Sequence, residues 1–73
     1  MDVKAEIVKK ILDLKDCEKH YFNMFMDSGA LVVKMENMYF LFSIPLYGGE
    51  AGFHQIYKRK DVEKLVDEAL SWT

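Results

Sequence analysis

Cysteine is almost absent from this 73-residue sequence, which contains Cys17 alone. A single cysteine cannot form an intramolecular disulfide or a cysteine-based zinc cluster. Since no signal-type apolar segment lies near the N-terminus, we expect a protein of the reducing cytoplasm. The longest apolar-rich run, residues 38–47, is about half as long as a membrane helix and contains Ser43 and Pro45. We therefore expect no membrane span.

Proline and glycine are also scarce, and they gather in one stretch. The single proline and three of the four glycines lie within residues 45–52. Such clustering predicts a loop between two strands. A phosphate-binding loop would lead directly into a helix, usually through Lys-Ser or Lys-Thr. Because Phe53 and His54 follow here, we interpret the stretch as a hairpin connection.

Neither sign of charge dominates, since ten Lys and Arg residues oppose twelve Asp and Glu residues for a net charge of −2. Nucleic-acid binders usually carry a basic excess, so this balance disfavours that class. The one basic cluster comprises Lys58, Arg59, Lys60 and Lys64. The helix predicted to follow it is acidic, with Asp61, Glu63, Asp67 and Glu68. Nucleic-acid binding through the basic cluster remains an alternative that the charge disfavours.

Apolar residues, by contrast, make up 51% of the chain and aromatic residues 14%, which favours a folded protein over a disordered one. Residues 1–73 have room for a single domain with one core. Apolar residues recur with helical spacing in residues 2–15 and again in residues 61–72. We expect Asp61 to act as the N-cap of the second helix.

Between these helices the apolar pattern changes to a period of two, which predicts strands at residues 21–27, 30–36 and 38–44 and a weaker one at 53–58. The predicted fold is a single α+β domain of order α-β-β-β-(β)-α. In it an antiparallel meander sheet carries both helices on one face.

The register of the first three strands can be inferred from their turns. Two-residue loops at Ser28-Gly29 and Glu36-Asn37 place apolar residues together on one face, although Glu36 suits a turn with positive φ poorly and a longer loop there is an alternative. We expect both helices to cover this all-apolar face. The predicted core is then Ile7, Ile11, Leu14, Phe22, Met24, Leu31, Val33, Met35, Phe40, Phe42, Ile44, Leu65, Val66 and Ala69.

The opposite face of the predicted sheet mixes polar and apolar residues. On it Phe25, Val32 and Leu41 form a row across three strands, with Tyr21 and Tyr39 nearby. If both helices pack on the other face, this row is exposed and becomes a candidate interaction surface. The alternative is that a helix, or the loop at residues 45–52, covers the row.

Residues with catalytic chemistry are present but do not form a recognisable constellation. Tyr47, Glu50 and His54 surround the glycine-rich loop and form the best candidate for a small-ligand or acid–base site. His20 and Cys17 have no partners at the spacing of a metal site or an activated nucleophile. We therefore expect no catalytic residues, no bound metal and no cofactor.

The leading functional hypothesis is a non-enzymatic protein-interaction module that forms a homodimer or docks to a larger partner. Small domains of this kind are common among phage and mobile-element products. The alternatives are nucleic-acid binding by the basic cluster, and a ligand site or enzyme at Tyr47, Glu50 and His54.

Overall fold

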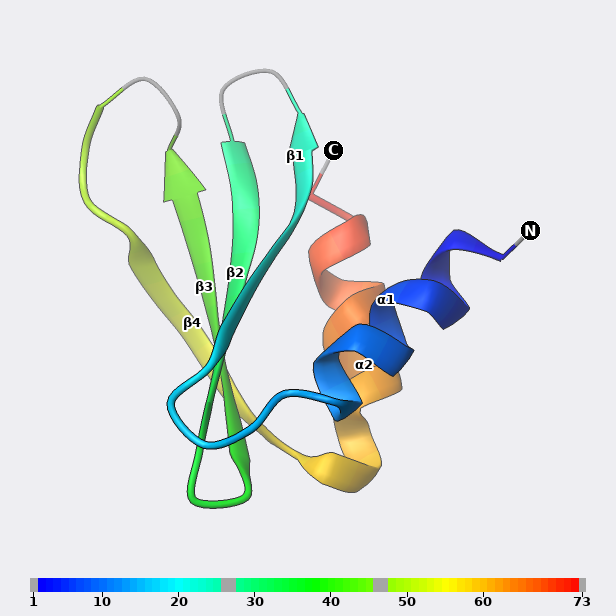
Figure 1. The fold of residues 1–73 in the computed structure, drawn as a ribbon. Coiled ribbons are helices and arrows are strands. Elements are labelled where there is room, and N and C mark those ends of the chain that lie inside the picture. The colour runs from blue at the N-terminus through cyan, green and yellow to red at the C-terminus, as the bar shows by residue number, and fades with distance from the viewer. Residues whose placement is uncertain (1, 26–27, 46–47, 73) are drawn as a thin grey trace.

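The fold is that of a computed structural model, which describes residues 2–25, 28–45 and 48–72. Its elements are α1 (Val3–Leu12), β1 (Lys19–Phe25), β2 (Ser28–Met35), β3 (Met38–Pro45), β4 (Gly52–Lys58), the short 3-10 helix η1 (Arg59–Asp61) and α2 (Val62–Leu70). The strands form one antiparallel sheet in the order β1-β2-β3-β4, and both helices lie on the same side of it (Figure 1). The predicted α+β meander with two helices on one face is confirmed.

The two helices begin in different ways. Asp2 caps α1, because its side chain accepts a hydrogen bond of 3.0 Å from the Lys4 N–H. Asp61 occupies the N-cap position of α2, but among the described residues its carboxylate accepts no capping hydrogen bond. It lies 3.8 Å from Lys64 Nζ instead. The predicted capping by Asp61 is therefore wrong, and η1 leads the chain into α2 in its place.

The register between β2 and β3 is the predicted one, with Leu31 opposite Phe42 and Val33 opposite Phe40. The connecting turn has Glu36 at φ 50° and Asn37 at φ 65°, as a two-residue type I′ hairpin requires. Glu36 is unusual in this conformation, but its N–H donates a hydrogen bond of 3.1 Å to Asp16 Oδ1. This bond from the α1–β1 connection holds the turn in place.

The predicted register between β1 and β2 is wrong. Tyr21 lies opposite Leu31 and Phe22 opposite Ala30, and the register shifts between Phe22 and Phe25. Asn23 within this irregular stretch has φ 53°. The irregularity moves the hairpin loop away from Ser28-Gly29, which belong to β2, and places Phe22 on the helix side of the sheet.

The helices cover the mixed face of the sheet, not the all-apolar one. Val32, Tyr39 and Leu41 are completely buried beneath them. The predicted helix contribution is confirmed, since Ile11, Leu65, Val66 and Ala69 are buried and Ile7 and Leu14 pack against them. Of the sheet residues predicted for the core, only Phe22 is buried in it. The prediction for the other sheet residues is wrong. The observed core is Ile11, Phe22, Ala30, Val32, Tyr39, Leu41, Tyr57, Val62, Leu65, Val66 and Ala69.

The polar residues of the covered face explain why it can lie against helices. Asn23 Nδ2 donates a hydrogen bond of 2.7 Å to the Ala69 carbonyl oxygen of α2. Lys34 Nζ lies 3.4 Å from Asp16 Oδ1, in the connection that follows α1. A buried polar group must keep a partner. The helices and their connections provide these partners, so a mixed face suits the helix side.

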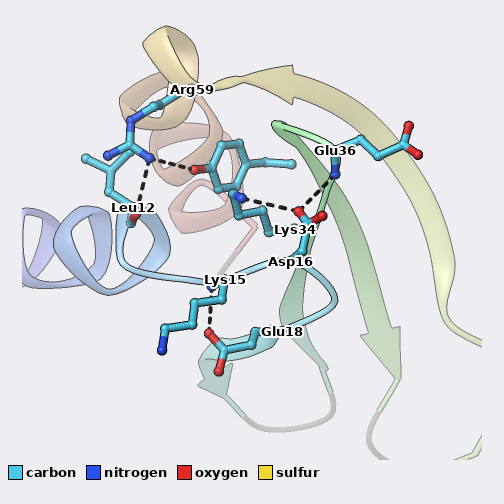
Figure 2. Close-up of polar contacts among 8 residues, drawn as sticks. Leu12, Lys15, Asp16, Glu18, Lys34, Glu36 and Arg59 are labelled. Atoms are coloured by element: carbon cyan, nitrogen blue, oxygen red, sulfur yellow. Dashed lines mark hydrogen bonds and ion pairs between the residues drawn. The ribbon is translucent and has the colours of Figure 1, made fainter.

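One corner of the molecule joins α1, the sheet and η1 through polar contacts (Figure 2). Arg59 donates from one guanidinium nitrogen to the Leu12 carbonyl oxygen at 3.3 Å and to Tyr39 Oη at 3.2 Å. Leu12 ends α1, where carbonyl groups have no partner within the helix. Arg59 thus links the end of α1 to the core tyrosine of β3.

Among the described residues, no helix combines the length and the apolar character that crossing a membrane would require.

Candidate interaction surface

The sheet surface that faces away from the helices is apolar from edge to edge, and we call it the open face. Its rows follow from strand pairing: Tyr21, Leu31, Phe42 and Phe53 form one row across all four strands. Met24 also belongs to it, because a Cβ added at Gly29 would meet Met24 Sδ. Its apolar members are Tyr21, Met24, Leu31, Val33, Met35, Met38, Phe40, Phe42, Ile44, Phe53 and Ile56.

Many of these side chains are strongly exposed. The exposed fraction is 55% for Phe53, 47% for Met24, 46% for Tyr21, 45% for Met35 and 42% for Ile56. The remaining members are half-buried by their neighbours within the sheet. Phe53 packs its ring against Phe42, with centroids 5.7 Å apart in an edge-on arrangement, and against Phe40 at 6.4 Å. The open face is therefore one continuous apolar surface.

Lysines border the open face at both outer strands. Lys19 of β1 lies in the row of Val33 and Phe40, and its Nζ sits 5.6 Å from the centre of the Tyr21 ring. Lys58 ends β4 opposite Met38. The described strands place no carboxylate on this face. Electrostatically it is an uncharged centre with a positive group at each edge.

The surface predicted from sequence lies largely on the wrong side of the sheet. Val32, Tyr39 and Leu41 have no exposed area, because α1 and α2 cover them. Tyr21 is exposed, but on the open face. The side chain of Phe25 lies outside what the structure describes. The alternative that a helix covers the row is thus the observed one for Val32 and Leu41.

The sequence pattern grouped seven residues of the open face but assigned them to the core, namely Met24, Leu31, Val33, Met35, Phe40, Phe42 and Ile44. It placed Tyr21 on the opposite face. The mixed face did not exclude the correct assignment. Two of its polar residues, Asn23 and Lys34, contact α2 or the connection that follows α1, whereas Ser43 is exposed. Polar residues beside an apolar row are therefore compatible with a helix-covered face when the helices and their connections provide partners.

The basic cluster is divided between different roles. Arg59 is engaged by the Leu12 carbonyl and Tyr39, so its guanidinium serves the fold. Lys64 lies near Asp61 and keeps most of its side chain exposed. Lys58 and Lys60, together with Lys64, line a shallow depression beside Met38 and Ile56. The cluster is therefore a set of three surface lysines without the arginine best suited to bind phosphate.

The candidate ligand site at the glycine-rich loop is not assembled in the described part of the chain. Tyr47 lies outside the described residues. Glu50 borders a shallow hollow with Ser43 and Gly52. His54 points elsewhere: its Nε2 lies 3.1 Å from Glu68 Oε1, and its ring meets the Trp72 ring edge-on at 5.2 Å. His54 thus contacts α2 and the residues that follow it.

The other chemistry-bearing residues also have structural partners. His20 stacks on Phe22, and burial, followed by the charge of Lys10, lowers the pKa of His20 below its ordinary value. Cys17 is exposed, has φ 69°, and donates its N–H to the Lys34 carbonyl oxygen at 2.8 Å. Burial, followed by the charge of Glu68, raises the pKa of Tyr57. Within the described residues no group of three His, Cys, Asp or Glu side chains could hold a metal ion.

No family model matches the chain, and no curated protein or solved structure gives a significant match to it.

Proposed function

We propose that this chain is a protein-interaction module without catalytic activity of its own, and that the open face is its contact surface. The composition of that face carries the proposal. An antiparallel sheet with helices on one side commonly alternates apolar residues toward the core with polar residues toward water. In this sheet apolar side chains occupy both faces along β2 and β3.

Exposed apolar area of this extent is unfavourable for an isolated protein. Each Å² of apolar surface removed from water stabilises a complex by about 25 cal/mol before the costs of association. Large contiguous apolar patches on small proteins mark interaction sites for this reason. Phe53, Tyr21 and Ile56 are the members with most to gain from a partner, because they are aromatic or branched and about half exposed.

The open face is also preformed, which favours binding. Its residues lie on strands, and the β2–β3 turn is pinned by the hydrogen bond between Glu36 N–H and Asp16. A preformed surface loses little conformational entropy when a partner docks.

The two alternative functions have weaker support. A ligand site at the glycine-rich loop would need His54 beside Glu50, whereas His54 contacts Glu68 and Trp72. Nucleic-acid binding would depend on three lysines alone, because Arg59 is engaged within the fold. We also propose a cytoplasmic location, because the exposed thiol of Cys17 is unpaired, as is usual in a reducing compartment.

Site-specific photo-crosslinking tests the proposal. A photoreactive phenylalanine analogue at position 53 should give discrete protein adducts in the cells that produce the chain. The same analogue at Val3, which is 62% exposed on α1, is the matched control and should give none of these adducts. Adding Ile56→Lys should abolish the adducts formed from position 53. Protein adducts that are equal from both positions, or absent from position 53, would contradict the proposal.

A further inference from the structure

We infer that the occupant of the open face is a second copy of this chain, packed sheet against sheet about a twofold axis. The inference rests on the proposed function, because it takes the open face as a protein-binding surface and names the protein that binds there.

The area of the open face matches what a stable dimer needs. Its five most exposed members, Tyr21, Met24, Met35, Phe53 and Ile56, are 42% to 55% exposed. Since large side chains have on the order of 200 Å² each, these five offer roughly 500 Å². The half-buried members add about 200 Å² more. Two copies together would bury roughly 1,400 Å², within the range of about 1,200–2,000 Å² for specific complexes.

The shape of the open face also suits a second copy. The sheet is twisted, and both helices lie on its far side, so nothing in the described residues stands over the face (Figure 1). Twisted sheets pack face to face when their twists match, with strands nearly aligned or nearly perpendicular. A second copy has the same twist and the same width by construction. A twofold interface uses the same patch on both copies, which a single continuous apolar face provides.

The charges at the edges of the face select the direction of the twofold axis. An axis along the strands would lay β1 of one copy over β4 of the other, because these are the outer strands, and would bring Lys19 toward Lys58. An axis across the strands lays β4 over β4 in opposite directions. Lys58 ends β4, so this axis separates the two Lys58 side chains by about the length of the strand and keeps each away from Lys19 of the other copy. The separation of like charges therefore favours the axis across the strands.

Sedimentation equilibrium over a wide range of concentrations tests the inference directly. The wild-type chain should shift from 8.6 kDa toward twice that mass as concentration rises. Phe53→Lys should raise the dissociation constant about 100-fold, because the twofold axis places two unpaired charges in the apolar interface. Val3→Lys makes the same chemical change at an exposed site on α1 and should leave the dimer intact. Circular dichroism checks that each variant is folded, and Ile56→Lys provides a second disruption on the same face.

A charge reversal tests the direction of the axis. With the axis across the strands, Lys58→Glu should change the dissociation constant little, because Lys19 of the other copy lies far from it. A dimer that Lys58→Glu tightens clearly, and that Lys58→Glu with Lys19→Glu no longer tightens, would overturn the axis across the strands.

The outcomes separate this inference from the proposed function. A chain that stays monomeric at all concentrations, or a dimer that Phe53→Lys leaves intact, would show that a second copy does not bind the open face. If position 53 then crosslinks to a different protein, the proposed function stands and only the identity of the partner is wrong. A monomer that floats with anionic phospholipid vesicles, and loses this with Phe53→Lys, would assign the face to a membrane and overturn both proposals.

Discussion

Two neighbouring valines provide the sharpest test of which face of the sheet the helices cover. Val32 and Val33 are adjacent in β2 and point to opposite faces. Val32 is completely buried beneath the helices, whereas Val33 lies half-buried on the open face. Replacing each by alanine removes the same two methyl groups from the same strand. The difference between the two variants therefore reports burial, since the loss of strand propensity is shared.

The expected magnitudes follow from burial. Two fully buried methyl groups contribute about 1.6 kcal/mol in transfer free energy, and the cavity adds to this. Val32→Ala should lower the free energy of unfolding by about 2–3 kcal/mol, and Val33→Ala by about 0.5 kcal/mol. For a domain of this size, whose stability is on the order of 5 kcal/mol, the larger loss is severe.

Urea unfolding followed by Trp72 fluorescence and circular dichroism measures both losses. Both changes should be made in the Phe53→Lys background, so that association through the open face does not contribute to stability. The m-value should stay constant between the variants, which shows that the comparison concerns the folded state. If Val33→Ala costs as much as Val32→Ala, or more, the helices do not cover the face of the sheet that carries Val32.

Two further predictions concern backbone strain and pH. Glu36→Gly should raise the free energy of unfolding by about 0.5–1 kcal/mol, because glycine adopts the φ of 50° without steric strain. The relief of strain exceeds the cost of ordering a glycine, which has more conformational entropy in the unfolded chain. A lower midpoint in urea would contradict this. For His20, burial and Lys10 lower the pKa in the folded state, so the unfolded chain binds the proton more tightly. Stability should therefore fall as the pH drops from about 6.5 toward the lower pKa of the folded state, and His20→Gln should reduce this fall. An NMR titration midpoint for the His20 ring at or above 6.5 would refute the reasoning.

Local features of the fold were predictable because they depend on neighbouring residues. Helical spacing identified both helices within a few residues of their ends, and the alternating pattern identified all four strands. The β2–β3 register followed from a two-residue turn with apolar partners on either side. The β1–β2 register did not, because the irregularity at Asn23 has no comparable local signal.

The candidate site was predictable in content but not in position. Periodicity grouped Leu31, Val33, Phe40 and Phe42 on one face, and the structure keeps them together there. Assigning that face to the core assumed that the most apolar surface attracts the helices. The helices instead cover the face on which Asn23 donates a hydrogen bond to the Ala69 carbonyl oxygen and Tyr39 accepts one from Arg59.

The sequence by itself determined the α+β class, the order of the elements and the alternation of residues along β2 and β3. Only the tertiary structure decided which of the two alternating faces lies under the helices. Alternation separates two sets of residues but is symmetric between the two sides of a sheet. That symmetry is broken by long-range contacts, such as Asn23 with Ala69 and Arg59 with Leu12, whose partners lie far apart in the chain. The open face exists because those contacts hold both helices on the other side.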